Sequence, residues 1–577
     1  MMPLLLAHVF ILHEAQGDSV DDATLSLLLC CKSALAMIAV TVVTMLWWRS
    51  AEATRVRKIV RRDGSQILPT PVPVLPRWLG FFGGHTLLID PPKFTAQVEN
   101  WAEEFGGDYE LNIFGRRMVV LTSVADIRRV LTLRPSKFRR GLGSSRNGWA
   151  AKQAEVVPSM FFDEGKEWGR SRRLISPNLV GHNVTAMIAY ISKIGERLCT
   201  RLSEHAESCE AVDAKQYFAH FTHDIIALAA FGVDVNSTGA MADRPCPSFE
   251  AIESTLTILA LNRKTFKKLQ WKYLSTLVPW VRRLKKSSQK MRAVVQMATD
   301  AARSDGIGDV PSTGGDRVFA GTLLRKIVGG PDRSATSDRM KFSDNEVLHE
   351  IKGLFIAGTD TTSLALSWAM YYLVKNPVAF ARCRAEGLKA APMSAGMVST
   401  SEQLSHLVFC AAVFREVVRL RTAGPFLIHT SLEDHWTKSG FKIEKGTPVM
   451  VLNRFASTSE DNFTRGAEFV PERWIESERA DALLGKSQGD GVERNVRHVD
   501  EAFLAFGSGP RVCPGQDLAK AEATTIIAAV CSRFDVLLAP DQPDPPEEIQ
   551  RFTLGPRAIH LIFKRKEGTD IQNKVSK

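Results

Sequence analysis

The amino-acid sequence predicts a mainly α-helical protein with small β-sheets, preceded by one transmembrane helix near the amino end. Three observations support this fold class. Residues 23–48 form a long apolar run with a single charge, as a membrane-spanning helix requires. Several later segments repeat apolar residues at helical spacing, whereas only short segments have the pattern of strands. Apolar residues make up 45% of the 577 residues, so the chain can bury a large core.

The apolar run reads ATLSLLLCCKSALAMIAVTVVTMLWW, and Lys32 is its only charged residue. A cleaved signal peptide would carry its positive charge before the apolar run, so we prefer a retained anchor over that alternative and over a buried core helix. The positive-inside rule then places the chain after residue 49 in the cytosol, leaving residues 1–22 as a short lumenal segment. The charges behind this orientation are Asp18, Asp21 and Asp22 before the run and Arg49, Arg55, Arg57, Lys58, Arg61 and Arg62 after it.

The rest of the chain divides into a linker, one large domain and a tail. Residues 49–80 are basic and rich in proline, and the spaced prolines favour a stiff, extended backbone. Residues 81–564 follow without an obvious break. Residues 565–577 are polar and predict a frayed tail.

Within this domain the apolar spacing predicts where helices and strands lie. The hairpin prediction covers Tyr109–Ser123, and the segment GFKIEKGTPVMVL predicts two short strands around Lys445 and Gly446. The segment FTLGPRAIHLIFKRK near the carboxyl end has a similar pattern. The predicted helices include Ala186–His205, Phe218–Phe231 and Leu348–Val374, and Ser304–Ser337 predicts a surface loop.

Charge and cysteine usage narrow the function classes. The net charge of +11 favours contact with anionic lipid or an acidic partner, and the absence of a recognition motif argues against nucleic acid. The sequence holds nine cysteines but no CxxC pair, so neither a zinc ribbon nor a thioredoxin-like site is indicated, and the spacing gives no support to an iron–sulfur cluster. This usage is typical of a reducing compartment, with mostly inert thiols.

One cysteine stands apart, in the segment FGSGPRVCPG from Phe506 to Gly515. Cys513 comes just before a predicted helix, where free backbone N–H groups and the helix dipole favour a thiolate. A thiolate there is a nucleophile or a metal ligand, and no local motif offers the histidine that a nucleophile needs. Haem iron accepts one axial cysteine, and Arg511 would suit a haem propionate. The alternative is a buried structural cysteine in a glycine-rich turn.

This segment resembles the haem-binding signature of the cytochrome P450 family, Phe-x-x-Gly-x-Arg-x-Cys-x-Gly. The matching positions include Phe506, Gly509, Arg511 and Cys513. The resemblance spans roughly Pro69 to Lys564. It implies a cytochrome P450 fold in which haem b lies between a distal helix, named I, and a proximal helix, named L, with Cys513 as the axial thiolate ligand.

A second resemblance lies in GLFIAGTDTTSLALSW, residues 353–368. Gly358 weakens this helix, and threonine side chains divert backbone hydrogen bonds, so we expect it to bulge and open a pocket. Asp360 and Thr361 match the acid–alcohol pair that relays protons on the distal side of the haem in the family. A polar stripe facing solvent is the alternative interpretation.

A third resemblance concerns the scaffold. Glu416 and Arg419 are three residues apart in FREVVRL and share one helical face, a spacing that also occurs by chance in solvated ion pairs. In the family this is the Glu-x-x-Arg motif, which meets an arginine from a later Pro-Glu-Arg-Phe motif. Here PERW supplies Arg473, and Trp474 replaces the usual phenylalanine.

Three more residues are expected near the haem propionates. Trp168 and Arg172 are one helical turn apart, so both can point at one propionate. The alternative is an interface tryptophan beside surface arginines. His429 stands where many family members have an arginine or histidine that faces a propionate.

The resemblance implies a haem-dependent monooxygenase anchored in the endoplasmic reticulum membrane, with its catalytic domain in the cytosol. It would insert one oxygen atom from O2 into a lipophilic substrate. Electrons would come from NADPH through a separate NADPH–cytochrome P450 reductase, with cytochrome b5 as a second candidate partner. The alternatives are a haem-thiolate isomerase or dehydratase that acts on peroxides, and a non-catalytic haem-binding sensor. Substrate choice is expected to depend on Lys137–Pro158 and Glu250–Val281.

Overall fold

The structure is a computed structural model, and it describes the parts of the chain that carry most of the predicted elements. Among the described residues, no helix is long and apolar enough to cross a membrane. The predicted anchor, the loop Ser304–Ser337 and nearly all of the predicted linker, tail and substrate segments lie outside the described residues. The described residues are 59–60, 66–67, 91–113, 116–140, 156, 158–240, 246, 248–250, 252–253, 255–256, 286, 289–290, 292–293, 295–296, 299, 342–392, 394, 396–438, 440–475 and 499–566.

The chain divides into two compact units. The first comprises Met1–Lys58, Pro73–Leu88 and Leu111–Arg117, and its described residues all lie in the last of these segments. The second comprises Ile59–Val72, Ile89–Glu110 and Met118–Lys577. All of the helices described belong to the second unit.

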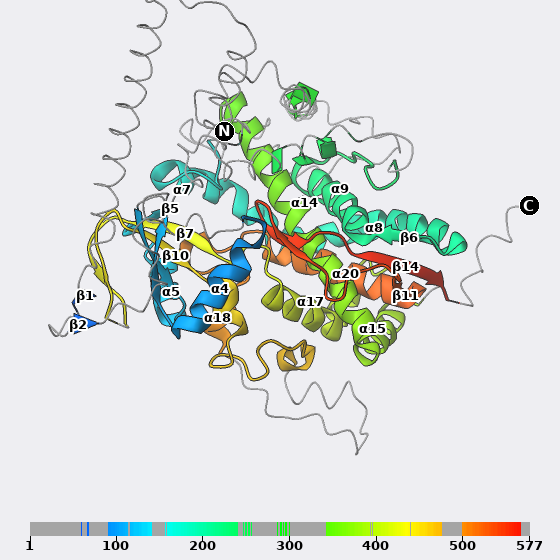
Figure 1. The fold of residues 1–577 in the computed structure, drawn as a ribbon. Helices are drawn as coiled ribbons and strands as arrows, with labels where there is room; N and C mark the ends of the chain where they lie inside the picture. The colour runs from blue at the N-terminus through cyan, green and yellow to red at the C-terminus, as the bar shows by residue number, and fades with distance from the viewer. Residues whose placement is uncertain are drawn as a thin grey trace, which may run out of the picture. The chain divides into compact units, whose positions relative to one another are not determined.

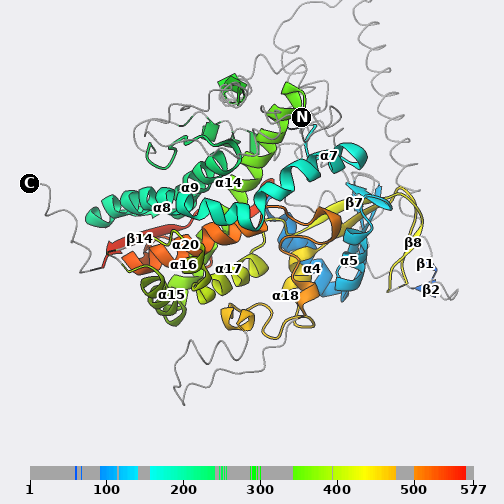
Figure 2. The same cartoon turned by 180° about the vertical axis from the view of Figure 1, so that it is seen from behind.

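Helices dominate this second unit, as the sequence predicts (Figures 1 and 2). The three predicted helices are present and longer than their sequence patterns. The α-helices are α4 (Phe94–Phe105), α5 (Val124–Thr132), α7 (Gly165–Ile175), α8 (His182–Ser208), α9 (Ala214–Phe231), α14 (Asp344–Lys375), α15 (Pro377–Ala390), α16 (Ser401–Ser405), α17 (Val408–Leu420), α18 (Asn453–Thr458) and α20 (Gln516–Arg533).

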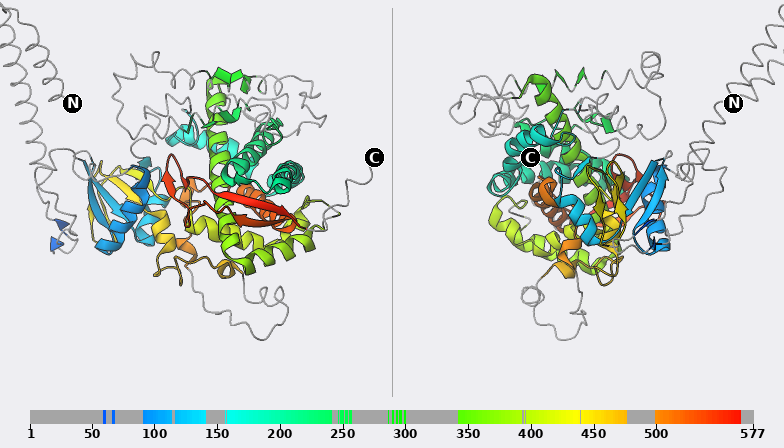
Figure 3. Two further views of the ribbon diagram at one scale, coloured as in Figure 1. Left: turned by 45° about the vertical axis from the view of Figure 1, so that its right-hand side comes forward. Right: turned by 90° about the vertical axis from the view of Figure 1, so that its left-hand side faces the viewer.

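Helix α14 forms the centre of the helical core and packs against α9, α15, α17 and α20. It begins with a capping box, in which the Ser343 hydroxyl accepts from the Glu346 backbone and the Glu346 carboxylate accepts from the Ser343 backbone. It ends at Lys375, just before Pro377 opens α15. Figure 3 (left) shows α14 running upright with α8 and α9 on one side.

The expected bulge at Gly358 is not present, because α14 is an uninterrupted α-helix through this position. The glycine serves packing instead. A Cβ at Gly358 would lie 2.8 Å from Cγ1 of Ile226 in α9, so its missing side chain lets the two helices approach closely.

The strands form small sheets. A five-stranded sheet has the order β3-β4-β10-β7-β5, and a three-stranded sheet has the order β11-β14-β6. The remaining strands pair as β1-β2, β8-β9 and β12-β13. The strands are β1 (Ile59–Val60), β2 (Gln66–Ile67), β3 (Tyr109–Ile113), β4 (Arg116–Leu121), β5 (Phe138–Arg140), β6 (Ala211–Asp213), β7 (Leu427–Ser431), β8 (His435–Trp436), β9 (Lys442–Ile443), β10 (Pro448–Val451), β11 (Phe534–Leu538), β12 (Glu548–Gln550), β13 (Leu554–Pro556) and β14 (His560–Arg565).

The strands predicted around Lys445 and Gly446 are β9 and β10, but they pair with different partners. Strand β9 pairs with β8, whereas β10 lies parallel to β4 and antiparallel to β7. Local sequence shows two strands here, and only the fold decides which neighbours complete their hydrogen bonds.

Candidate functional site

The cysteine segment forms a tight turn between a short 3₁₀ helix, η9 (Gly509–Arg511), and α20. Gly509 has a φ of +70°, and a Cβ there would lie 2.5 Å from the backbone oxygen of Leu131 at the end of α5. The Cys513 N–H donates to the Phe506 carbonyl at 2.9 Å. The turn is therefore fixed both by its own hydrogen bond and by close contact with α5.

The environment of Cys513 differs from the expected thiolate-stabilising helix start. Burial raises the pKa of the Cys513 thiol, while the N–H of Gly515 and the positive charge of Arg172 act in the opposite direction. Burial is the largest of these effects, yet the residue keeps part of its surface exposed. This suits a sulfur that ionises when a cation binds beside it, because a coordinating metal removes the proton outright.

A group of cationic and imidazole side chains lies close to this turn. We call it the arginine–histidine cluster: Arg134, Arg140, His429 and Arg511. Arg140 ends β5 and His429 lies directly opposite it in β7. Arg134 contacts His429 Nε2 at 3.2 Å and donates to the carbonyl of Ser508 at 3.0 Å. Two sheet strands, the end of α5 and the cysteine turn thus bring the four side chains together.

The cluster holds more positive charge than its protein neighbours balance. Glu164 pairs with Arg511 Nη2 at 2.8 Å and also accepts from the Arg140 N–H at 2.9 Å. Burial, and to a smaller extent the neighbouring arginines, lower the pKa of Arg140 to about 9 and that of Arg134 to about 10. An anion at this place would relieve the mutual repulsion.

The protonation and hydrogen bonding of His429 indicate what kind of anion would bind to the cluster. Burial and the three arginines hold the pKa of His429 well below its usual value, so its ring is neutral. Because Arg134 can only donate, Nε2 of His429 must accept, and the ring proton must be on Nδ1. That Nδ1–H has no hydrogen-bond partner among the residues that the structure describes.

Other hydrogen-bond donors of the cluster also lack partners in the described part of the chain. Nε of Arg140 and both Nε and Nη1 of Arg511 are buried and lack partners within the described part of the chain. Unpaired buried donors cost free energy, and native proteins retain few of them without a ligand. Several such donors around one place require a group with several acceptor oxygens.

The predicted residues Trp168 and Arg172 of α7 both act on this arrangement. The Arg511 guanidinium lies over the Trp168 ring, 4.6 Å from its centroid. The positive charge of Arg172 acts to lower the pKa of Cys513 and that of Arg511. Trp168 therefore orients Arg511, and Arg172 acts on both the sulfur and the cluster.

On α14, Asp360 and Thr361 lie on a partly exposed stripe of an otherwise buried helix, together with Ala357. The Thr361 hydroxyl donates to the Ala357 carbonyl at 2.8 Å, and Asp360 Oδ2 accepts from the Thr553 hydroxyl. Burial raises the pKa of Asp360, whereas Thr553, Lys215 and Arg551 oppose that rise. A carboxyl group so placed can exchange a proton more readily than a fully solvated one.

Helix α9 holds α14 beside this pair. The Thr222 hydroxyl donates to the Thr359 carbonyl at 2.7 Å. His223, also in α9, contacts the Thr359 hydroxyl through Nδ1 at 3.3 Å and the Ser248 hydroxyl through Nε2 at 2.8 Å. Both ring nitrogens of this buried histidine are therefore bonded.

The three predicted scaffold residues meet in a fully buried network. Arg419 makes two bonds to Glu416, at 2.9 and 2.7 Å, and Arg473 donates to the same carboxylate at 3.1 Å. The remaining guanidinium nitrogens of both arginines bond to backbone carbonyls. The ring of Phe463 lies 4.9 Å from the Arg419 guanidinium.

Sequence analysis missed three residues of these sites. Trp474 donates its indole N–H to Glu416 at 2.8 Å, a bond that the phenylalanine usual at this position could not make. Arg134 and Arg140 lie on either side of the segment PSKFR, and no local motif marks them. The available signal was two arginines at the start of the region expected to touch substrate, Arg134 just before it and Arg140 within it.

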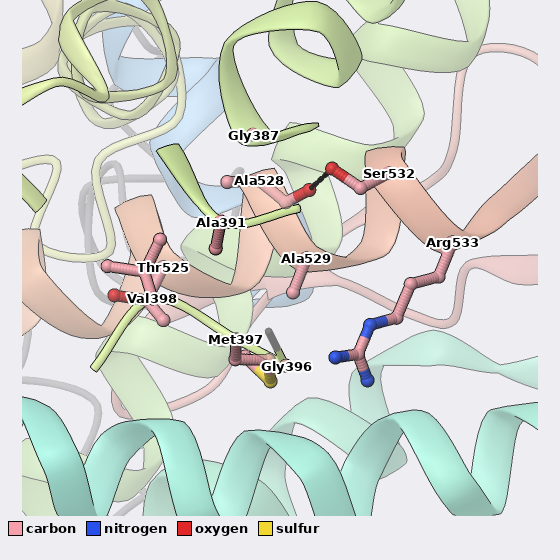
Figure 4. Close-up of a pocket in the computed structure, with 10 residues that line it drawn as sticks. All are labelled: Gly387, Ala391, Gly396, Met397, Val398, Thr525, Ala528, Ala529, Ser532 and Arg533. Atoms are coloured by element: carbon pink, nitrogen blue, oxygen red, sulfur yellow. Dashed lines mark hydrogen bonds between the residues drawn. The ribbon is translucent and has the colours of Figure 1, made fainter. Parts of the chain in front are cut away.

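A separate small hollow lies between α15, α20 and the segment that precedes α16 (Figure 4). Its lining is mostly small and apolar, with Thr525, Ser532 and Arg533 as the polar members. Arg533 is paired with Glu196. The hollow contains none of the predicted site residues and is smaller than a usual ligand pocket.

Comparison with known proteins shows which family the chain resembles. The family model described as Cytochrome P450 matches residues 73–563. The carotene epsilon-monooxygenase of Arabidopsis thaliana is 25% identical over 450 residues, covering 77% of each chain. The steroid 17-alpha-hydroxylase/17,20 lyase of Oryzias latipes is 24% identical over 539 residues, covering 90% of this chain and 93% of its own.

A fungal relative and a solved structure extend these matches. The cytochrome P450 monooxygenase sphH of Aspergillus fumigatus is 25% identical over 520 residues, covering 84% of this chain and 86% of its own. A crystal structure of a cytochrome P450 has the same fold, with a TM-score of 0.67 and 19% identity over 83% of this chain and 96% of its own. The chain therefore belongs to the cytochrome P450 family, a family of haem-thiolate monooxygenases, and is an oxidoreductase.

Proposed function

We propose that this protein is a membrane-anchored monooxygenase that holds haem b through Cys513 and oxidises a lipophilic substrate. One substrate molecule, O2, NADPH and a proton would give the hydroxylated product, water and NADP+. NADPH–cytochrome P450 reductase would deliver the electrons, and cytochrome b5 is a second candidate donor. The observation that carries this proposal is the arginine–histidine cluster beside Cys513, with its unpaired donors.

The residues present suit a haem. Its two propionates would supply the acceptor oxygens that Arg511, Arg140 and the His429 Nδ1–H lack, and their charge would balance the arginines. Cys513 would bind the iron, whose positive charge offsets the burial of the thiolate. Bound haem would supply the chemistry that activates O2, with the thiolate favouring cleavage of the O–O bond.

The chain's own residues would then manage protons and water. Asp360 would pass protons from solvent to Thr361, whose hydroxyl is anchored on the Ala357 carbonyl. The apolar side chains of α14 around the pair would keep bulk water scarce. The Glu416 network would hold α17 and the PERW segment in place beneath the site.

Two aromatic side chains support a lipophilic substrate. Phe161 is one of the exposed large apolar residues, and its ring lies 5.7 Å from that of Phe552. Relatives named for carotene and steroid oxidation act on large apolar molecules. The proposal does not choose among such compounds.

The membrane part of the proposal depends on the apolar run over residues 23–48 and the basic residues after it. We propose a single-pass anchor in the endoplasmic reticulum membrane with the catalytic domain in the cytosol. Fractionation and protease protection of the full chain would test this location.

The first test of the proposal is Cys513→Ser. We expect this variant to lose the thiolate-type spectrum of the reduced carbon monoxide adduct, because serine offers no comparable soft ligand. Cys209→Ser is the matched control, since Cys209 is an exposed free cysteine. An unchanged Cys513→Ser spectrum would refute the ligand assignment. Turnover of a hydroperoxide, with none from NADPH, reductase and O2, would instead favour an isomerase or dehydratase.

A further inference from the structure

We propose that Thr553, in the turn between β12 and β13, is a positioning residue that holds the carboxyl group of Asp360 for proton transfer. The inference deepens the proposed function, because it depends on Asp360 belonging to the proton relay. Asp360 and Thr553 are far apart in the sequence, so only the folded chain brings them together.

The contact is a side-chain hydrogen bond, in which the Thr553 hydroxyl donates to Asp360 Oδ2. The turn that carries Thr553 is itself held in place. The Arg551 N–H donates to the Thr553 carbonyl at 2.8 Å, and the Leu554 N–H donates to the Ala423 carbonyl at 2.9 Å. The hydroxyl therefore approaches Asp360 from a fixed backbone, which limits the freedom of the bond.

A second contact fixes the hairpin against the same face of α14 (Figure 3, left). A Cβ at Gly555 would lie 2.4 Å from Cδ2 of Leu364, so a larger residue there would force the Leu364 side chain to move. Asp360 and Leu364 are four residues apart and lie on one face of α14. Thr553, in the turn, and Gly555, in β13, therefore meet the same face of the helix at two points.

The charges around Asp360 explain why its carboxyl group needs holding. Lys215 of α9 and Arg551 of the turn both act on Asp360. Glu253, on a third segment, has its pKa raised by burial and by Asp360. Without the Thr553 bond, the carboxylate would be free to turn toward either cation and form an ion pair. A carboxylate engaged in that way is a poorer proton donor and acceptor for Thr361.

The test compares five variants of the full, haem-loaded chain: Thr553→Val, Thr553→Ser, Asp360→Asn, Asp360→Ala and Thr200→Val. Valine removes the hydroxyl with little change of shape, and serine restores it. Thr200→Val is the control, because the Thr200 hydroxyl bonds only to its own helix at Glu196 on the exposed side of α8. Should Thr553→Val fail to fold, Thr553→Ala replaces it.

The first readout needs no known substrate. With reductase and NADPH alone, each NADPH reduces one O2 to hydrogen peroxide, or two NADPH reduce one O2 to two waters. The second route needs more protons at the site, so a damaged relay favours peroxide. We expect the ratio of peroxide formed to NADPH consumed to rise about twofold in Thr553→Val and in Asp360→Asn. Thr553→Ser and Thr200→Val should match the original chain.

The second readout is stability, which does not depend on turnover. The denaturant unfolding effects of Thr553→Val and Asp360→Ala should be non-additive, because the two side chains share one bond; alanine is used here because the amide oxygen of asparagine could still accept from Thr553. The bond lowers the pKa of Asp360, so the destabilisation by Thr553→Val should shrink as falling pH protonates that carboxyl group.

The outcomes distinguish a failure of the proposed proton relay from a failure of the proposed role of Thr553. A peroxide ratio unchanged in Asp360→Asn would overturn the proposed relay itself. A raised ratio in Asp360→Asn with an unchanged ratio in Thr553→Val would overturn only the role of Thr553. Additive unfolding effects would likewise show that the bond does not position Asp360, whatever the ratios are.

Discussion

The Glu416 network and the arginine–histidine cluster both bury charge, but they treat their polar atoms in opposite ways. In the network, both carboxylate oxygens of Glu416 and all the guanidinium nitrogens of Arg419 and Arg473 are bonded within the chain. In the cluster, Arg140, Arg511 and His429 keep buried donors without partners in the described part of the chain. The network is satisfied within the protein, whereas the cluster leaves buried donors that a bound anion would satisfy.

This difference separates a structural role from a binding role. A satisfied network of buried charge fixes the position of the elements it joins, and its loss leaves uncompensated charge behind. An unsatisfied cluster costs free energy until its ligand arrives, and the ligand then recovers that cost as affinity. Arginine therefore has a structural role in the network and a binding role in the cluster. Whether its donors are hydrogen-bonded within the chain distinguishes the two roles.

The largest expected effect comes from breaking the network at its centre. Glu416→Ala would leave Arg419 and Arg473 buried without their counter-charge, at a cost of about 3–5 kcal/mol in the free energy of unfolding. We expect a chain that folds poorly and retains little haem, measured by soluble yield and denaturant unfolding. Near-normal stability would mean that the network is not the structural anchor that its geometry indicates.

Arg511→Met tests the binding role of the arginine–histidine cluster. Loss of charge-assisted bonds worth about 1.5–3 kcal/mol should speed haem release about tenfold to a hundredfold. Transfer of haem to apomyoglobin measures this rate. Stability in denaturant should fall far less than in Glu416→Ala, because Arg511 pairs with the partly exposed Glu164 and keeps two buried donors without partners in the described part of the chain, whereas Glu416 is fully bonded. Equal losses of stability in the two variants would erase the distinction between network and cluster.

Trp474→Phe sharpens the comparison within the network. The substitution restores the aromatic residue usual in the family but removes the indole bond to Glu416. We expect a loss of about 1–2 kcal/mol in denaturant unfolding, with an unchanged rate of haem release. Trp436→Phe is a suitable control, since Trp436 lies in β8, outside the network. A neutral result would show that the other Glu416 bonds compensate.

The smallest expected effect comes from His223, whose bonded ring contrasts with that of His429 in the cluster. His223 has both nitrogens bonded, and burial lowers its pKa to about 3 in the folded protein. Below the ordinary value of 6.5, the unfolded chain gains a proton that the folded chain does not, so stability falls as pH falls from that value.

We therefore expect His223→Gln to flatten this decline by up to about 1.4 kcal/mol per pH unit. Denaturant unfolding at about pH 7 and about pH 5 measures the slope, with the exposed His406→Gln as control. An unchanged slope in His223→Gln would show that another group governs the acid sensitivity.

Much of the fold followed from local pattern. The apolar spacing of residues 348–374 predicted most of α14, and the capping residues that set its start were present in the sequence. The bulge expected at Gly358 was wrong, because the pattern could not show that Ile226 of α9 would occupy the space beside it. Helix propensity is a local quantity, and close packing of two helices is not.

The site shows the same division. The resemblance to the family implied that Glu416, Arg419 and Arg473 would meet, and they do. It gave no reason to choose Arg134 or Arg140, since their positions depend on the pairing of β5 with β7. It also gave Trp474 no role of its own, because an indole hydrogen bond requires a partner that only the fold supplies.

The sequence by itself determined the family, the cysteine turn and the helical character of the body, because each depends on residues close together in the chain. The tertiary structure decided which buried donors remain unpaired, which way the histidine proton points and that Thr553 meets Asp360. These features depend on contacts between residues far apart in sequence, and hydrogen-bond geometry exists only once the backbone has brought them within reach.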